Sequence, residues 1–203
     1  LERCLATLLE QTTPPTTIAV YDTGESSDRF ESLRRTHPDV AFEIGKNRGY
    51  AGGANRVVDR LVRSDQAVDF VLVLNPDVEL EANYAGRLIA SMNVLPRVAI
   101  GTGKLLRPDR VTLDSAGIII PRNRRPRDRG SEERDLGQLD VPEFVDAASG
   151  AAMMLRVNAL DDLAVEGELF DESFFAYHED TDLCWRARLF GWRILYEPRA
   201  IGL

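Results

Sequence analysis

The chain has 203 residues, with 33 acidic and 25 basic side chains and a formal net charge of −8. This length suits one domain with a single core. The acidic balance argues against a dedicated nucleic-acid binder, which normally carries a basic excess. Hydrophobic residues make up 44% and charged residues 29% of the chain, which excludes a disordered or collagen-like chain. We find neither an apolar run of roughly 18 residues, as a membrane span needs, nor a secretory signal at the start.

The two cysteines, Cys4 and Cys184, lie far apart and fit no metal-binding or redox spacing. They could form one disulfide but not a disulfide framework. We therefore expect a reducing, cytoplasmic setting.

Predicted helices and strands alternate along the first half of the chain. An opening helix over residues 1–10 carries four leucines on one face. The next elements are a strand at 17–21, a polar turn at 22–28 leading into a helix, a strand at 40–44, a loop and helix at 49–62, and a strand at 70–74. The last strand is a continuous apolar run, which is typical of a strand covered on both faces.

The second half is more mixed, with predicted strands at 118–120 and 151–155 and a helix at 180–190. Alternating strands and helices predict an α/β sheet with helices on both sides. Ligands bind such sheets at the carboxyl ends of the strands. Two polar loops, 22–28 and 75–77, directly follow predicted strands and mark the expected place of the chemistry.

Residues 121–130 contain five arginines and no apolar period, which predicts a loop. Guanidinium groups pair well with phosphates, so this loop could act as a lid or clamp. The favoured alternative is a solvated loop whose charge is balanced locally by Glu132, Glu133 and Asp135.

The motif Asn75-Pro76-Asp77 ends the most hydrophobic strand. A carboxylate there is well placed to hold Mg²⁺ or Mn²⁺ together with substrate phosphate oxygens. All three residue types are equally favoured in a plain turn. Alone, the motif does not decide between a metal site and a turn.

The glycine-rich segment 47–55 (Asn-Arg-Gly-Tyr-Ala-Gly-Gly-Ala-Asn) opens a predicted helix. Backbone N–H groups at a helix start attract anions, and small residues allow close approach. The segment matches neither the dinucleotide-binding fingerprint nor the P-loop. Its alternative role is tight packing of the helix.

Aromatic residues at 174–177 run directly into the acids Glu179, Asp180 and Asp182. Acids are expected at a helix start on dipole grounds alone, but the aromatic run suggests partial burial, which raises the pKa of a carboxyl group towards that of a general base. Asp182 and Arg186 are spaced to pair along the helix. His178 is interpreted as a local hydrogen-bonding residue.

Five sequence blocks follow one another along the chain: Asp22–Asp28, Asn47–Asn55, Leu74–Val78, Ser149–Met154 and Phe170–Arg186. In this order they resemble glycosyltransferase family 2, in particular its bacterial rhamnosyltransferase-like branch. The resemblance implies a GT-A fold with a mixed, mainly parallel sheet. It implies one catalytic domain over 1–203, with a nucleotide-binding half at about 1–100 and an acceptor-binding half at about 101–203. The family's first strand and C-terminal end would lie outside this sequence.

The resemblance also implies an activity: inverting transfer of a sugar from a nucleotide-diphosphate donor to a hydroxyl of a glycan or lipid-linked acceptor in cell-surface polysaccharide synthesis. Rhamnose is the sugar suggested by the branch. Carried over by position, Asp180 is the catalytic base and Asp77 the ligand of Mg²⁺ or Mn²⁺. The remaining predicted substrate contacts are Asp22, Asn47, Arg48, Gly52, Gly53, Asn75, Glu179 and Arg186.

One base and one metal suffice for such a reaction, because the hydroxyl attacks in line and the cation neutralises the departing diphosphate. Two departures from the family pattern bear on the site. Asn75 replaces the first acid of its metal motif, which leaves one fewer charge for the cation, and Thr23 stands where many relatives have Asn.

Two other functions stay open. A sugar-1-phosphate nucleotidyltransferase would show an early glycine-rich loop with Arg and Lys, which we do not find. A non-catalytic nucleotide- or glycan-binding module is the second. Peripheral contact with the inner membrane and a homo-oligomer are left open.

Overall fold

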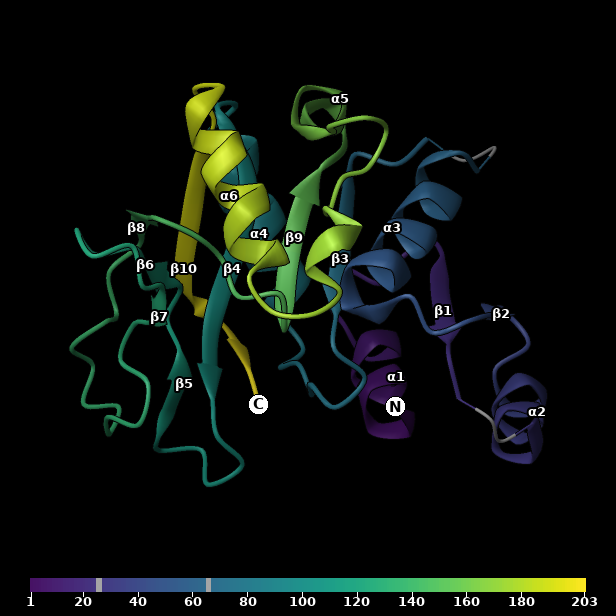
Figure 1. Cartoon of the computed structure of the whole chain (residues 1–203). Helices are drawn as coiled ribbons and strands as arrows, with labels where there is room; N and C mark the ends of the chain where they lie inside the picture. Colours follow the sequence, from purple (N-terminus) through teal and green to yellow (C-terminus); the bar gives the residue numbers. More distant parts are fainter. Residues whose placement is uncertain (25–26, 65–66) are drawn as a thin grey trace.

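A mixed β-sheet with helices on both faces forms the centre of the computed structural model, which describes residues 1–24, 27–64 and 67–203 (Figure 1). The predicted turn residues Glu25 and Ser26 lie outside the described residues. The strand order is β3-β9-β4-β10-β8, and β5 pairs with β4. These strands are Phe70–Leu74, Ala152–Arg156, Val98–Leu106, Arg193–Gly202, Glu143–Val145 and Leu113–Ser115, respectively.

The strand directions confirm the α/β class and define how the sheet is mixed. β9 runs antiparallel to both β3 and β4, and β10 is parallel to β4. The three strands β3, β4 and β10 therefore share one direction. Most ladders of this sheet are nevertheless antiparallel, because β9 separates β3 from β4, and β8 and β5 are antiparallel to their neighbours.

A separate two-stranded parallel sheet is formed by β1 (Ile18–Asp22) and β2 (Val40–Ile44), joined through α2 (Ser27–Thr36). Helix α3 (Gly49–Val62) contacts both β1 and β3, and α1 (Glu2–Leu9) lies at the same junction of the two sheets (Figure 1). The carboxyl ends of β1 and β2 meet at one edge, because parallel strands end on the same side. Asp22 and the loop before α3 therefore start from the same edge.

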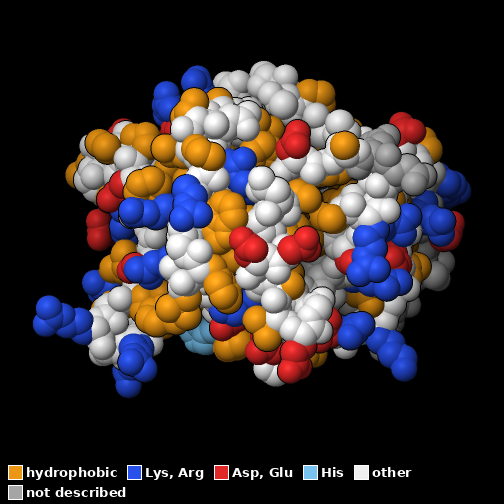
Figure 2. Space-filling view, turned by 90° about the horizontal axis from the view of Figure 1, so that it is seen from above, with side chains coloured by type: hydrophobic (Ala, Val, Ile, Leu, Met, Phe, Trp, Pro, Cys, Tyr) orange, Lys and Arg blue, Asp and Glu red, His pale blue; other side chains and the backbone are white. Residues whose placement is uncertain are grey.

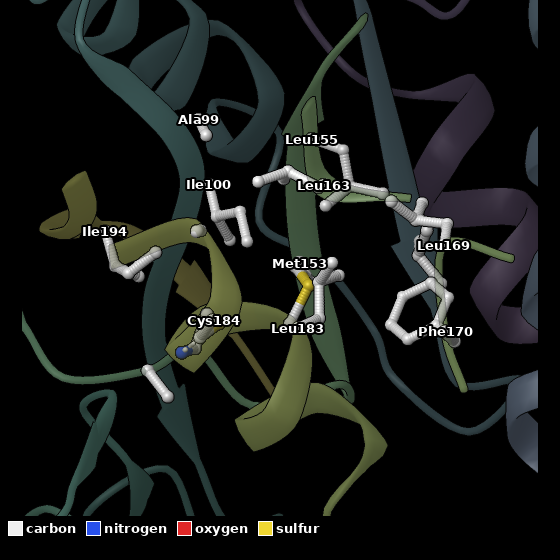
Figure 3. Packing of buried hydrophobic residues seen from close by; sticks show 14 of the residues in the cluster. Ala99, Ile100, Met153, Leu155, Leu163, Leu169, Phe170, Leu183, Cys184 and Ile194 are labelled. Atoms are coloured by element: carbon white, nitrogen blue, oxygen red, sulfur yellow. Dashed lines mark hydrogen bonds between the residues drawn. The ribbon is translucent and has the colours of Figure 1, made fainter. Parts of the chain in front are cut away.

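Helices α4 (Tyr84–Asn93) and α6 (Glu179–Leu189) cover opposite faces of the larger sheet. Along β9, Met153 and Leu155 join the core beneath α6, whereas Met154 joins the core beneath α4. Figure 3 shows Leu183 and Cys184 of α6 packed towards Met153 of β9 and Ile100 of β4. Residues of β3 divide between the same two cores, which confirms the prediction that this strand is covered on both faces.

The arginine-rich segment is not a plain loop. Arg127–Asp128 forms β7, which pairs antiparallel with β6 (Ile118–Ile119). Glu132 pairs with Arg107, and Asp135 pairs with Lys104 at 2.7 Å. Two of the three acids expected to balance the arginine run, Glu132 and Asp135, are therefore paired with cations outside that segment, and the expectation is wrong for these two.

The remaining short elements are η1 (Val157–Ala159), α5 (Leu160–Leu163) and η2 (Glu172–Phe174). Both cysteines are free and buried, so they do not form a disulfide. In the described part of the chain, no helix combines the length and apolar character that crossing a bilayer requires. On the face shown in Figure 2, acidic and basic side chains are scattered among hydrophobic ones.

An apolar cavity of about 820 Å³ lies between β1 and β3. Consecutive residues of both strands line it, together with residues of α1, α3 and α4. Among the described strands, β1 pairs only with β2 and β3 only with β9, so each has one unpaired edge. We call this cavity the inter-sheet slot. Its end at the carboxyl ends of the strands is lined by Thr23, Asn47 and Asn75.

Candidate active site

The start of α6 holds two adjacent acids in different surroundings. The helix is fixed by Leu183, Cys184 and Ala187, which are fully buried in the core. Three of the four residues directly before α6, namely Phe175, Tyr177 and His178, have positive φ angles of 60°, 72° and 74°. Such backbone is costly for residues other than glycine and is concentrated at functional sites.

Asp180 is half-buried, and its carboxylate is held by backbone and hydroxyl donors. The Gly150 N–H donates to Oδ2 at 2.9 Å. The Thr181 N–H and hydroxyl donate to Oδ1 at 2.6 Å and 3.2 Å. These donors fix the carboxylate while leaving lone pairs for a further proton. The geometry therefore suits a general base.

Glu179 is only 5% exposed, and its Oε2 has no hydrogen-bond partner among the described residues. Burial, followed by the charge of Asp180, raises the pKa of Glu179. The prediction of partial burial at this acidic cluster is confirmed for Glu179. An unpartnered buried carboxyl group is unusual in a folded chain, which favours contact with a ligand at this position.

The glycine-rich segment packs against the segment that leads to α6. Arg48 pairs with Glu172 at 2.7 Å. The Asn55 side chain both donates to the Phe170 carbonyl at 2.7 Å and accepts from the Phe170 N–H at 2.8 Å. The Ala51 N–H donates to the carbonyl of Phe175. These contacts join α3 to the η2 region.

The two neighbouring glycines of α3 differ in how much space they have. A Cβ on Gly52 would lie 2.4 Å from the Cβ of Arg48 and 3.2 Å from Oε2 of Glu172, whereas a Cβ on Gly53 would lie 3.6 Å from the Tyr21 ring. The structure thus favours the packing role for Gly52. Gly53 lines the inter-sheet slot, and its predicted contact with substrate stays a prediction.

Asp22 and Asn47 each close a tight turn at the end of a strand. Oδ1 of Asp22 accepts from the Gly24 N–H at 2.8 Å, and Oδ1 of Asn47 accepts from the Gly49 N–H at 2.9 Å. Asn47 lines the inter-sheet slot together with Asn75. The fold thus brings Asn47 and Asn75, two predicted substrate contacts that are far apart in sequence, to one cavity.

Asn75 and Asp77 form the turn that follows β3. The Asn75 carbonyl accepts from the Val78 N–H at 3.3 Å, and its N–H donates to the Ala151 carbonyl at 2.9 Å. Asp77 is exposed. No group of three or more potential metal ligands exists within the described ranges. One free carboxylate and one amide oxygen fit a cation whose other ligands come from substrate phosphates and water.

Arg186 has a structural position. It pairs with Asp182 at 2.8 Å, as predicted, and donates to the carbonyls of Leu163 and Leu169. Each guanidinium nitrogen thus bonds a protein group, which ties α6 to the end of α5 and to the chain before η2. The geometry favours this role over the predicted contact with substrate, so we do not include Arg186 in the proposed site.

Sequence reasoning missed Gly150 and Tyr50 as parts of the site. A Cβ on Gly150 would lie 3.0 Å from the Tyr50 hydroxyl and 3.4 Å from Oδ2 of Asp180. Gly150 belongs to one of the blocks that carried the family resemblance, and Tyr50 belongs to the glycine-rich segment. Neither signal indicated that the two residues contact each other.

Solved structures with this arrangement of strands are GT-A glycosyltransferases. A crystal structure of GalNAc-T7 with UDP, GalNAc and Mn²⁺ superimposes with a TM-score of 0.73 at 11% identity, over 100% of this chain and 40% of the other. The mannosyltransferase PcManGT from Pyrobaculum calidifontis, in complex with GDP-Man and Mn²⁺, gives 0.65 at 16% identity, over 99% and 51%. The chain thus has the GT-A fold and spans about half or less of these two proteins.

The sequence profile of glycosyl transferase family 2 matches residues 1–162, and the chain belongs to this family. It is 29% identical to the N-acetylglucosaminyl-diphospho-decaprenol L-rhamnosyltransferase of Mycobacterium tuberculosis over 98% of this chain and 70% of that protein. It is also 29% identical to the low-salt glycan biosynthesis hexosyltransferase Agl10 of Haloferax volcanii, over 83% of this chain and 52% of that protein.

Proposed function

We propose that this chain is the catalytic domain of an inverting glycosyltransferase. It moves a sugar, with rhamnose as the first candidate, from a nucleotide-diphosphate donor to a hydroxyl of a lipid-linked or glycan acceptor in cell-surface polysaccharide synthesis. The observation that carries the proposal is the Asp180 carboxylate, which three donors hold at the start of α6. The family and the rhamnosyltransferase relatives support it.

In the proposed reaction, Asp180 accepts the proton of the attacking acceptor hydroxyl. The hydroxyl oxygen forms a bond to the anomeric carbon, and the bond from that carbon to the phosphate oxygen breaks. The nucleoside diphosphate leaves with the electron pair. A single base is sufficient, because no covalent sugar–enzyme intermediate has to form.

The donor side of the site lies at the carboxyl ends of β1, β2 and β3. Asp22, Asn47, Arg48 and Gly53 would contact the nucleotide end of the donor, and Glu179 would contact the acceptor. Asp77 and Asn75 would hold a divalent cation, Mg²⁺ or Mn²⁺, which neutralises the charge of the diphosphate when bound. The presence of Mn²⁺ in both solved neighbours supports a divalent cation here.

The cation proposal predicts that Asp77→Ala weakens Mn²⁺-dependent donor binding by at least about tenfold, because a direct carboxylate ligand is lost. Calorimetric titration of dTDP-rhamnose, UDP-sugars and GDP-sugars, with and without Mn²⁺, measures the effect. Asp39→Ala is the control, since Asp39 is also exposed but lies just before β2, at its amino end. Unchanged donor binding in Asp77→Ala would remove this residue from the metal site.

The activity itself is tested by incubating the donors with a polyprenyl-diphosphate N-acetylglucosamine acceptor. NMR analysis of the product then reports the anomeric configuration. We expect a product inverted relative to the donor. Retention of configuration would contradict the proposed role of Asp180, and donor binding without transfer or hydrolysis would instead support a binding module.

We propose that the reaction takes place at the cytoplasmic face of a membrane, with the domain in peripheral contact. The relative's name, which specifies a decaprenol-linked acceptor, supports this location. Vesicle flotation with and without the lipid-linked acceptor would test it. Size-exclusion chromatography with light scattering would test whether the protein forms a homo-oligomer.

A further inference from the structure

Tyr50 connects the glycine-rich end of α3 with the loop before β9. Its hydroxyl donates to the carbonyl of Gly150 at 2.6 Å. Its ring packs edge-to-face against Phe170, with centroids 6.0 Å apart. Burial, and then the charges of Asp180 and Glu179, raise the pKa of Tyr50 well above its ordinary value of 10.0. The hydroxyl is therefore neutral and available as a donor at any pH at which the enzyme would work.

Both backbone polar groups of Gly150 form hydrogen bonds with side chains of the site. Its carbonyl accepts from Tyr50, and its N–H donates to Oδ2 of Asp180 at 2.9 Å. Glycine rotates more freely about its backbone bonds than any other residue. Fixing the carbonyl of Gly150 therefore restricts the direction of its N–H, which is a donor to the carboxylate.

The other charged or titratable groups around Asp180 do not replace this donor. Its charge acts on Tyr50 of α3, Asp128 of β7, Glu179 next to it and Cys184 one turn along α6. Two of these are acids, and burial raises the pKa of the Cys184 thiol to about 12. Among the described residues, the hydrogen-bond donors to this carboxylate belong to Gly150 and Thr181.

We propose that Tyr50 is a positioning residue that orients the Gly150 N–H towards Asp180, so that the base keeps both its direction and its charge. This inference rests on the proposed function. Tyr50 also lines the inter-sheet slot beside Asn47. It therefore lies between the donor side of the site and the base.

The test is Tyr50→Phe, which removes only the hydroxyl. With ¹⁵N-labelled protein, the pH dependence of the Gly150 amide shift reports the ionisation of the carboxylate that it contacts. A hydrogen bond to the charged form favours that form, so we expect the titration midpoint to move to higher pH by about half a unit or more. The acidic limb of kcat should move in the same direction, with kcat about tenfold lower and donor affinity unchanged.

Tyr84→Phe is the matched control. Tyr84 is fully buried, and its hydroxyl donates to the carbonyl of Ala152 at 3.1 Å, two residues beyond Gly150, but from α4 on the other face of the sheet. We expect this variant to be less stable, with the Gly150 midpoint and the pH profile unchanged. Thermal denaturation confirms that each variant is folded before it is compared.

Two results would overturn the proposal. One is a titration midpoint of the Gly150 amide in Tyr50→Phe equal to that of the wild type. The other is a midpoint displaced in Tyr84→Phe by as much as in Tyr50→Phe. The amide titration does not depend on turnover. A wild type that transfers no sugar, with a displaced midpoint in Tyr50→Phe alone, would therefore contradict the proposed function and support the positioning role.

Discussion

Glu179 and Asp180 are adjacent in sequence, yet the helix gives them different surroundings. Successive residues on an α-helix point about 100° apart. Glu179 therefore turns into the protein, where its Oε2 has no partner among the described residues, while Asp180 reaches Gly150. Adjacent acids in such different surroundings are suited to different roles. The sequence predicted acids at a partly buried helix start, but periodicity could not show which acid Gly150 would hold.

The raised pKa of Glu179 predicts a pH-dependent stability. The unfolded chain loses this proton near the ordinary value of 4.5, whereas the folded chain keeps it to higher pH. Ionisation of Glu179 therefore favours unfolding as pH rises through this interval. Glu179→Gln removes this ionisation. The free energy of unfolding of the variant, relative to that of the wild type, should therefore be higher at pH 7 than at pH 4.

Chemical denaturation at the two pH values measures this gain, at about 1.4 kcal/mol per unit of pKa displacement. Glu10→Gln, a change at an exposed acid, should show none. An equal difference in the free energy of unfolding between Glu179→Gln and wild type at pH 4 and pH 7 would contradict the raised pKa of Glu179.

At the scale of single elements, α3 owes its position to close contacts around Gly52. A Cβ there would lie 2.4 Å from the Cβ of Arg48, which cannot move aside as the end of a flexible chain could. Gly52→Ala should lower the free energy of unfolding by about 1–3 kcal/mol, as overpacking does. Gly53→Ala should be neutral or stabilising by up to about 1 kcal/mol, because its Cβ has room and alanine favours the helix.

Urea denaturation of the two variants gives the comparison. The glycine-rich pattern predicted close approach but could not distinguish an approaching phosphate from an approaching side chain. Equal effects of Gly52→Ala and Gly53→Ala would contradict the packing account of Gly52.

Sequence reasoning missed several elements, and the largest of them are α4, β4 and β10. β4 contains Gly101 and Gly103, which ordinarily weaken a strand. A Cβ at these positions would lie 2.8 Å from Met92 Sδ and 2.1 Å from the carbonyl of Ala200, respectively. The absence of a side chain at these glycines thus allows α4 and the irregular part of β10 to pack closely against β4. That part of β10 contains Pro198, and its register with β4 shifts there. These close approaches join segments that are distant in sequence, so they leave no pattern in the local sequence from which the strand could be predicted.

At the scale of the whole molecule, the inter-sheet slot divides the fold into two sheets. Alternation of strands and helices was enough to predict the α/β class, and the order of motifs predicted the family. We propose that the edges of β1 and β3 can accept one further strand between them, as the family resemblance implied. The unpaired edges of these strands and the apolar lining of the slot support this.

This proposal predicts that an apolar N-terminal extension long enough to supply such a strand raises the Tm by several degrees, because it buries apolar surface and pairs backbone groups. The extension should also reduce fluorescence of the dye ANS bound to the 1–203 chain. An extension of equal length in glycine and serine is the control. The same Tm and dye binding for both extensions would contradict the proposed strand.

The central claim is that Asp180 takes the acceptor proton. Calorimetry and a radiolabelled transfer assay on Asp180→Asn test it together, because only the acceptor proton requires that carboxylate. We predict donor affinity within about twofold of wild type and a transfer rate lower by about 10²–10⁴-fold, with wild-type turnover in Asp39→Asn. Wild-type turnover in Asp180→Asn would contradict the account.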